Sequence, residues 1–367
     1  LRPAPVTDQW LRHGPELGDL DPMTRPLSLI EAPSPRAEAL AIALCLREAA
    51  VSGQKAALIT PDRTLARRVT AALDRWHLRP DDSAGRPLAL SAPGRFLRQS
   101  AGLMGGAVTA EALIALLKHP ITHSAVDRGP HLRHLRDLEL HLRRHAIPFP
   151  DRTALTDWAA RDPQRQDWAE WLTGAFALLP GDGEQPLADW VAAQDRLAAH
   201  LACGAGGEGT GELWQEAAGI AACALFDDLQ EYAGHGGAMA ASDYLALLET
   251  LFVGREVREG LEVHPGVMIW GTLEARAQGA DLVILGGLNE GSWPAATSPD
   301  PWFNRRMRLD AGLLLPERQI GLSAHDFQQA AGAPRIVLSR ARRDAEAETV
   351  PSRWLNRLTN LIGGLKA

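Results

Sequence analysis

The stretch Asp281–Pro294, DLVILGGLNEGSWP, decides the fold class of this protein. Its four apolar residues, Leu282–Leu285, form a run as short as a fully buried strand of a parallel sheet. A pair of glycines then breaks the strand and places Asn289, Glu290 and Trp293 just past its carboxyl end. Ligands of open α/β sheets bind at that edge. The stretch therefore predicts an α/β fold with a functional site in this loop.

Four further short apolar runs predict strands of the same sheet. Amphipathic helices over Arg36–Ala50 and Thr64–Trp76 alternate with the first two of them. Alternation of strand and helix at this spacing is typical of a parallel sheet built from βαβ units. We therefore predict one mainly parallel sheet that contains Leu282–Leu285 and the runs Leu27–Ala32, Ala56–Thr60, Val267–Trp270 and Arg335–Leu338.

The middle of the chain has a different pattern, without β-branched runs. It contains leucine- and alanine-rich stretches with helical periodicity: Thr109–Lys118, His131–His145, Leu187–Leu201, Leu213–Tyr232 and Ala241–Phe252. The sequence thus predicts a sheet domain interrupted by an inserted helical subdomain. The expected parts are a proline-rich linker over residues 1–26, the sheet domain over 27–106 and 253–367, and the helical insertion over 107–252. The end of the last part would lead into a further domain.

The composition is that of a globular protein with a substantial core: 46% of the 367 residues are hydrophobic and 23% are charged. The net charge of −7 argues against a uniformly basic nucleic-acid-binding protein but permits a local basic surface. Three widely spaced cysteines, Cys45, Cys203 and Cys223, indicate a reducing compartment, so we expect a cytoplasmic protein. No apolar run approaches the ~20 residues of a membrane span, and no membrane partner is expected.

The lysines exclude two kinds of catalytic motif. The chain has only Lys55, Lys118 and Lys366. None follows a glycine, as the lysine of a P-loop does, and none has an acidic residue two positions before it, as in a PD-(D/E)xK nuclease. We therefore expect no catalytic residue in this chain. His141 and His145 could face one metal ion from a helix, but neighbouring arginines would repel a cation, so no metal site is predicted.

The box Gly287–Pro294, GLNEGSWP, resembles motif V of the UvrD/RecB-type helicases, which ends in "GLNEG-x-[FW]-P". The preceding turn, Leu273–Asp281, departs from the segment with a His and "KGLE" that active helicases carry. The altered turn and the segments 299–330 and 350–358 resemble the AddB family. AddB proteins are the second subunits of the AddAB helicase–nucleases of bacterial break repair. The resemblance is strongest over residues 27–105 and 260–358.

This resemblance implies a RecA-like domain, of the P-loop NTPase type, interrupted by an insertion called subdomain 2B. It also implies a role in double-strand break repair and recombination. A helicase–nuclease subunit similar to AddA would hydrolyse ATP with Mg²⁺, and a nuclease domain would lie further along the chain. The chain itself would need no cofactor and would act as a DNA channel, a scaffold and a reader of a DNA recognition sequence. The expected partners are therefore single-stranded DNA, double-stranded DNA and the AddA-like subunit.

The last predicted strand leads into SRA, residues 339–341, which resembles motif VI of these helicases. The motif's arginine contacts the γ-phosphate of ATP as an arginine finger, so the resemblance places Arg340 at the finger position. By the same resemblance, Glu274 is the candidate partner of the ribose. The residues alone also fit an Arg340 that ends a strand and pairs with Asp344. Two alternative functions stay open: a nucleotide-sensing domain that binds ATP through Glu274 and Arg340, and an active helicase whose P-loop lies upstream of Leu1.

A basic and aromatic cluster predicts a binding surface. Residues 301–343 contain eight arginines and only three acidic residues, in a chain that is acidic overall. Aromatic rings beside guanidinium groups are typical of surfaces that hold single-stranded DNA. In the alternative interpretation, the tryptophans are core anchors and the arginines are the solvated face of a helix. The predicted DNA-binding residues are Trp293, Trp302, Phe303, Arg305, Arg306 and Arg308.

Overall fold

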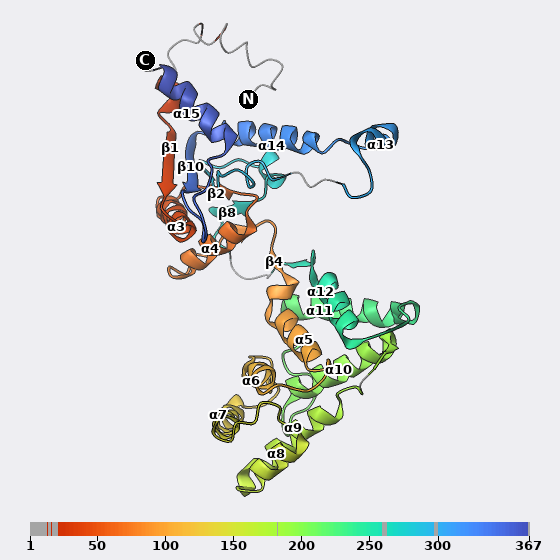
Figure 1. The fold of residues 1–367 in the computed structure, drawn as a ribbon. Helices are drawn as coiled ribbons and strands as arrows, with labels where there is room; N and C mark the ends of the chain where they lie inside the picture. Colours follow the sequence, from red (N-terminus) through yellow and green to blue (C-terminus); the bar gives the residue numbers. More distant parts are fainter. Residues whose placement is uncertain are drawn as a thin grey trace. The chain divides into compact units, whose positions relative to one another are not determined.

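The chain forms two compact units in a computed structural model that describes residues 13, 16, 21–181, 183–258, 263–296 and 300–365 (Figure 1). Residues 1–84 and 261–367 form one unit, which we call the sheet unit. Residues 85–260 form the other, which we call the helical unit. Most of the predicted linker over residues 1–26 lies outside the described residues, and its described end contains the short helix α2 (Asp21–Thr24).

The sheet unit is built on six parallel strands, which confirms the α/β prediction. They are β1 (Leu27–Ala32), β2 (Ala56–Ile59), β3 (Asp81–Asp82), β8 (Val267–Trp270), β9 (Leu282–Leu285) and β10 (Arg335–Ala341). Their order in the sheet is β1-β10-β9-β2-β8-β3, and all neighbours are parallel. All five predicted strands therefore lie in one sheet. The sequence pattern missed β3, because two aspartates have no apolar periodicity, and it ended β10 three residues early.

One face of the sheet is covered by α3 (Pro35–Val51) and α4 (Arg63–Asp74) (Figure 1). Their apolar sides enclose a core that includes Ile42, Leu58 and Val69. Because side chains alternate along a strand, this core receives every second residue of the central strands. All residues of β2, β8 and β9 are buried, as expected for strands that are covered on both faces.

Side-chain caps determine where these two helices begin. The Ser34 hydroxyl accepts a hydrogen bond from the N–H of Ala37 at 3.3 Å. An Asp62 carboxylate oxygen accepts from the N–H groups of Thr64 and Leu65 at 2.8 Å and 3.1 Å. Such caps satisfy N–H groups that have no partner within the helix. The chain therefore turns into a helix directly after β1 and β2.

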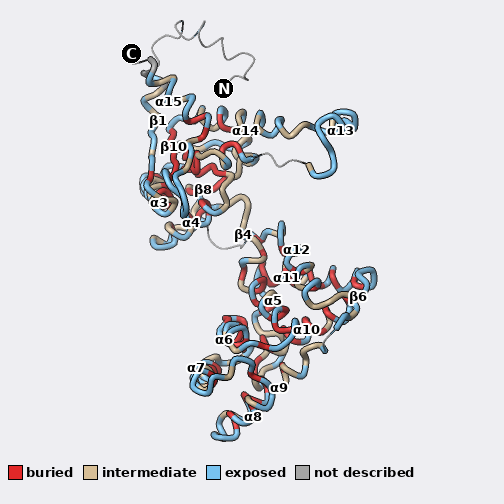
Figure 2. Tube along the Cα trace, in the orientation of Figure 1, coloured by how far each residue is buried: buried red, intermediate tan, exposed pale blue. Residues whose placement is uncertain are grey.

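The other face of the sheet carries α14 (Glu317–Ala330) and α15 (Arg353–Leu365). The core on this side includes the aromatic residues Trp293, Phe327 and Trp354. Figure 2 shows the buried residues of the sheet unit in red, with many of them in the central strands. The two cores give the sheet unit three layers, with the carboxyl ends of the strands free to carry loops.

The helical unit consists of helices and two short strand pairs. Its α-helices are α5 (Ala92–Gly102), α6 (Ala110–Lys118), α7 (Arg128–Arg144), α8 (Arg152–Ala159), α9 (Gln166–Ala177), α10 (Leu187–Cys203), α11 (Glu216–Tyr232) and α12 (Ala241–Phe252). The strand pairs are β4 (Arg86–Pro87) with β7 (Glu256–Val257), and β5 (Gln185–Pro186) with β6 (Ala238–Met239). Each of the five predicted helical stretches corresponds to one of these helices, although α11 begins at Glu216 instead of Leu213; α5, α8 and α9 were not predicted. In the described part of the chain, no helix combines the length and apolar character that a membrane crossing requires.

The division between the units falls at residues 84/85 and 260/261, whereas we predicted it at residues 106/107 and 252/253. On the first side, α5 belongs to the helical unit because its apolar face packs into that core and Gln194 of α10 donates to the Leu97 carbonyl at 2.8 Å. On the second side, β7 pairs with β4 and so continues the helical unit beyond α12. Both boundaries depend on contacts between distant parts of the chain.

Candidate functional site

The loop after β9, Gly286–Pro294, lies at the carboxyl edge of the sheet and forms the centre of the candidate site. Glycine is required at the first two positions of this loop for two different physical reasons. A Cβ atom on Gly286 would lie 2.8 Å from Leu58 Cδ1 in the core, and Gly287 has a φ of 74°. A close approach and a positive φ both favour glycine. The pair thus allows the chain to leave the strand and turn sharply over the edge of the sheet.

A buried carboxylate holds this loop against the sheet. Glu38 of α3 is buried, and its Oε1 accepts hydrogen bonds from the N–H of Gly287 at 2.9 Å and from the Ser339 hydroxyl at 2.8 Å. Burial raises the pKa of Glu38. Glu38 was not among the predicted site residues. The sequence did contain a signal for it, because Glu38, Ile42 and Leu46 are four residues apart and so lie on the same buried face of α3. Glu38 thereby connects α3, the loop after β9 and β10.

The loop also pairs with the segment that follows β10. The N–H of Leu288 donates to the Ser339 carbonyl, and the N–H of Ser352 donates to the Leu288 carbonyl, both at 2.9 Å. The Glu290 carboxylate accepts from the Arg353 guanidinium Nη2 at 2.9 Å, and the Arg353 side chain lowers the pKa of Glu290. The polar residues of the predicted site are therefore largely used to fasten two loops together.

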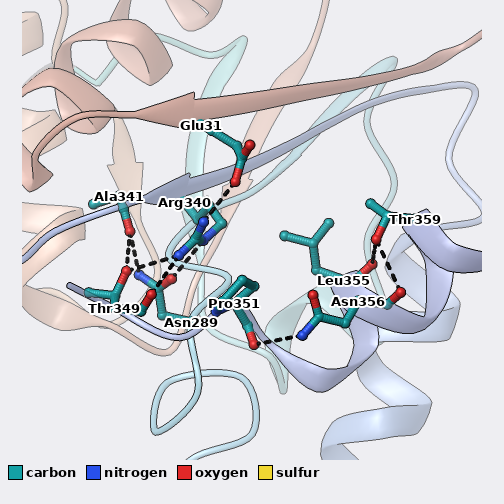
Figure 3. A network of polar contacts seen from close by, with 9 residues as sticks. All are labelled: Glu31, Asn289, Arg340, Ala341, Thr349, Pro351, Leu355, Asn356 and Thr359. Atoms are coloured by element: carbon teal, nitrogen blue, oxygen red, sulfur yellow. Dashed lines mark hydrogen bonds and ion pairs between the residues drawn. The ribbon is translucent and has the colours of Figure 1, made fainter.

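Arg340 is at the centre of a network of polar contacts at this edge (Figure 3). It is only 4% exposed. Its Nε donates to Asn289 Oδ1 at 3.0 Å, and its Nη1 forms an ion pair with Glu31 Oε1 at 2.7 Å. Its Nη2 donates to the carbonyl of Thr349 at 2.9 Å and to the hydroxyl of the same residue at 3.1 Å. Arg340 thus ends a strand, as the alternative interpretation proposed, but its acidic partner is Glu31 rather than Asp344.

The two predicted nucleotide-binding residues are not brought together. Glu274 lies in the 3-10 helix η6 (Glu274–Arg276) after β8, and β9 and β2 separate β8 from β10. At ~4.8 Å between neighbouring strands, these two strands are about 14 Å apart. Arg340 instead borders a concavity of ≈ 420 Å³ lined by Glu31, Pro33, Arg340, Arg342, Arg343, Glu348, Thr349 and Pro351. Glu274 is not among its lining residues.

The structure predicts a structural role for Arg340. Replacing Arg340 by methionine should lower the free energy of unfolding by about 2 kcal/mol, because the acceptors on Asn289 and Thr349 lose their donor. Urea denaturation followed by far-UV circular dichroism measures this change. Arg342→Met is the control, since Arg342 is exposed and its loss should change stability by no more than about 0.5 kcal/mol. Equal losses in the two variants would contradict the structural role.

Trp293 is a core residue, which corrects its predicted role in DNA binding. Its side chain is fully buried. The indole N–H donates to the Gly286 carbonyl at 3.1 Å, and the ring meets Phe327 and Trp354 edge to face. A ring without exposed surface cannot stack on a base. The prediction failed because the aromatic pattern of the loop does not reveal that α14 and α15 close over it.

The remaining predicted DNA-binding residues lie together around α13 (Arg305–Asp310), beside the beginning of α14 and apart from the sheet (Figure 1). Trp302 is 82% exposed, and Phe303 is exposed as well. The side chains of Arg305 and Arg306 are 77% and 91% exposed. Their ion-pair partners Glu317 and Asp310 are 45% and 72% exposed, and such surface pairs contribute little to stability. These guanidinium groups can therefore exchange one anionic partner for another.

Arg308 differs from its neighbours on α13 and is also corrected. Its side chain is 23% exposed. It forms an ion pair with Asp300, and its Nε donates to the Leu314 carbonyl at 3.1 Å. The N–H groups of Trp302 and Phe303 also donate to Asp300 and, together with Arg308, lower its pKa. Arg308 therefore holds the turn before α13 in shape and is not a free cation for DNA.

In the described ranges, no three or more His, Cys, Asp or Glu side chains are placed so that they could hold a metal ion together. The Nδ1–H of His145 donates to the His141 carbonyl at 2.9 Å. Sequence comparison adds no functional assignment, since no protein-family model and no curated protein matches this chain.

Proposed function

We propose that this chain is the helicase-like part of an AddB-like subunit in a DNA break-repair helicase–nuclease, and that it binds DNA without catalysing a reaction itself. The observation that carries the proposal is the exposed surface around α13. There, the largely exposed aromatic ring of Trp302 is close in the chain to the exposed guanidinium groups of Arg305 and Arg306. Aromatic stacking and phosphate contacts are what single-stranded DNA needs from a protein surface.

The arrangement of the sheet supports a RecA-like domain. The box after β9 and the arginine-containing end of β10 were the two segments that resemble helicase motifs. The strands β9 and β10 are direct neighbours and parallel, so both segments reach the same edge of the sheet. An AddA-like subunit would supply the ATP-driven motor with its Mg²⁺, and the complete complex would act in the cytoplasm on single-stranded and double-stranded DNA.

The contacts of Arg340 favour a scaffold over the nucleotide-sensing alternative. An arginine finger must present free N–H groups to a phosphate, whereas Arg340 directs its donors to Glu31, Asn289 and Thr349. ATP binding through Arg340 would require this network to open first. The same requirement applies to the second alternative, an active helicase with an upstream P-loop.

The proposed function predicts that the exposed arginines of α13 contribute to binding of single-stranded DNA. Arg305→Ala combined with Arg306→Ala should weaken binding of a fluorescent oligothymidylate on the order of tenfold at low salt, because two phosphate contacts are lost. The slope of log K against log salt should decrease in magnitude by about 1.4, at ~0.7 for each contact to a single strand. Fluorescence anisotropy of the full chain across a series of salt concentrations measures both quantities.

Two further variants define the test. Trp302→Ala should also weaken binding but leave the salt slope unchanged, because a stacking contact releases no counterion. Arg67→Ala combined with Arg357→Ala is the matched charge control, since both arginines are exposed and lie away from α13. Wild-type affinity and slope in the α13 double variant would show that this surface is only a solvated helix face.

A further inference from the structure

A second basic surface lies on the sheet unit, in a groove between α3 and α4. The groove has a volume of ≈ 740 Å³. Its lining comes from the beginning of α3, the end of α4 and the loop after β10, and it includes Ser34, Pro35, Arg36, Arg68, Arg75 and Asp344. Figure 1 shows that α3 and α4 lie on the same side of the sheet. The groove was not part of the predicted site.

The arginines of this groove are not engaged by acidic partners. Arg36, Arg68 and Arg75 are exposed, and within the described residues none of them forms an ion pair. The one acidic residue in the lining, Asp344, accepts hydrogen bonds from the N–H groups of residues 346 and 347, which lower its pKa. The groove therefore differs from the α13 surface, where each arginine has an acidic neighbour. Its cations are available for an anion from outside the chain.

The spacing of the arginines suits a ligand that carries several negative charges. Arg68 lies in α4, and Arg75 directly follows its last residue with a helical backbone conformation. Seven residues are about two helical turns, so the two arginines lie on the same face, separated by about 10 Å along the helix axis. The loop after β10, which contributes Asp344 and Ala345 to the groove, also carries Arg342 and Arg343, and these line the concavity of ≈ 420 Å³ together with Glu31 and Glu348. The N-terminus of the 17-residue helix α3 also opens into the groove, and its dipole favours anions. The spacing of Arg68 and Arg75 and the helix N-terminus point toward a ligand with more than one phosphate group.

We propose that this groove binds the sugar–phosphate backbone of double-stranded DNA. Guanidinium groups match phosphate geometry, whereas none of the lining residues described for the groove carries an aromatic ring. The ring of Trp76, next in the chain to Arg75, is half-buried and already contacts the guanidinium groups of Arg47 and Arg75, at 4.8 Å and 5.4 Å from its centroid, so it does not offer an open face to an unpaired base. A surface with phosphate contacts but no stacking platform fits a duplex, whose bases are already stacked inside. The inference rests on the proposed function for the choice of DNA as the polyanion. It assigns duplex DNA to the α3–α4 groove and single-stranded DNA to α13.

Charge reversal in the groove tests the proposal on the full chain. Arg68→Glu combined with Arg75→Glu should weaken binding of a fluorescent duplex at least on the order of tenfold and reduce the magnitude of the salt slope by about 1.8, at ~0.9 for each phosphate contact to a duplex. Binding of a fluorescent oligothymidylate should change less than about twofold. Fluorescence anisotropy at several salt concentrations measures these quantities.

The matched control is Arg67→Glu combined with Arg357→Glu. These residues are exposed; Arg67 is next to Arg68 but outside the groove lining, and Arg357 belongs to α15 on the other face of the sheet. This control changes the net charge equally and should retain duplex binding within about twofold. Equal effects of the two double variants on duplex binding would overturn the proposal. So would an equal loss of duplex and oligothymidylate affinity in Arg68→Glu/Arg75→Glu, because the groove would then not distinguish a duplex.

Failure of this inference is distinguishable from failure of the proposed function. Binding of single-stranded DNA is measured for the α13 variants, and binding of duplex DNA is measured for the groove variants. Each surface therefore has its own ligand and its own control. Loss of duplex binding in the groove variant, with normal single-strand binding, supports the groove whatever the α13 variants show.

Discussion

Replacing Trp293 by alanine is expected to lower the free energy of unfolding of the sheet unit by about 3–5 kcal/mol, in the range of large-to-small substitutions in protein cores. The indole is fully buried and packs against Phe327 and Trp354. Its removal would leave a cavity between β9, α14 and α15, and would leave the Gly286 carbonyl without its donor. Urea denaturation followed by far-UV circular dichroism measures the loss.

A second tryptophan, nine positions along the chain, supplies the matched control. Trp302 is 82% exposed, so Trp302→Ala should change the free energy of unfolding by no more than about 0.5 kcal/mol. Trp293→Phe should fall between the two, because it keeps a ring but loses the indole N–H. If Trp302→Ala were as destabilising as Trp293→Ala, the assignment of one tryptophan to the core and the other to the surface would be wrong.

The helical unit is expected to lose stability as the pH falls from about 6.5 to about 4. Burial lowers the pKa of both His119 and His131 from 6.5 to about 4. The contacts of His131 show why its neutral form is required: Trp168 Nε1 donates to its Nδ1 at 3.1 Å, and its Nε2 lies 2.8 Å from the Leu117 carbonyl. Nε2 therefore carries the proton, and Nδ1 must stay unprotonated to accept. Protonation would break this arrangement.

The direction of this pH dependence follows from the direction of the two pKa shifts. Because the folded-state pKa values lie below the unfolded value of 6.5, the unfolded chain binds more protons between these limits. The stability contribution is therefore fully present above pH 6.5 and is lost as the pH falls toward 4. Each histidine contributes up to about 3 kcal/mol. Nearby Arg95, Arg128 and His134 add positive charge and act in the same direction.

Urea denaturation of the full chain between pH 8 and 4.5 measures this effect. His131→Gln should flatten the pH dependence by up to about 1.4 kcal/mol per pH unit, the contribution of one proton, because glutamine can still donate to the Leu117 carbonyl but does not titrate. His235→Gln is the control, since His235 belongs to the same unit and is exposed. A His131→Gln variant with an unchanged pH dependence would contradict the role of the buried imidazole.

Segments with a strong local pattern were predictable from the sequence. The apolar runs Leu282–Leu285 and Val267–Trp270 formed strands within the predicted limits, and Ala241–Phe252 formed a helix with the predicted ends. Each of these patterns extends over consecutive residues, so the period of the apolar positions contains the information. β3 was missed because Asp81–Asp82 has no such pattern and joins the sheet only by pairing with β8.

The candidate site was predictable in position but not in the roles of its side chains. The loop after β9 does lie at the carboxyl edge of the sheet, since the Gly286-Gly287 turn is a local signal. The roles depend instead on partners far away in the sequence: Arg340 pairs with Glu31 across 309 positions, and Ser339 donates to Glu38 across 301. The number of arginines between residues 301 and 343 therefore overestimated the cations available to DNA, because Arg340 and Arg308 form ion pairs within the protein.

The sequence by itself determined the parallel α/β sheet, the interrupting helical segment and the composition of the loops at the sheet edge, because these follow from periodicity and turn residues along the chain. Only the tertiary structure decided which of two similar tryptophans is buried, which arginines remain available to an anion, and where one unit ends and the other begins. The physical reason is that burial and ion pairing are properties of neighbours in space. The helices that cover Trp293 and the carboxylates that engage Arg340 and Arg308 reach them only when the chain is folded.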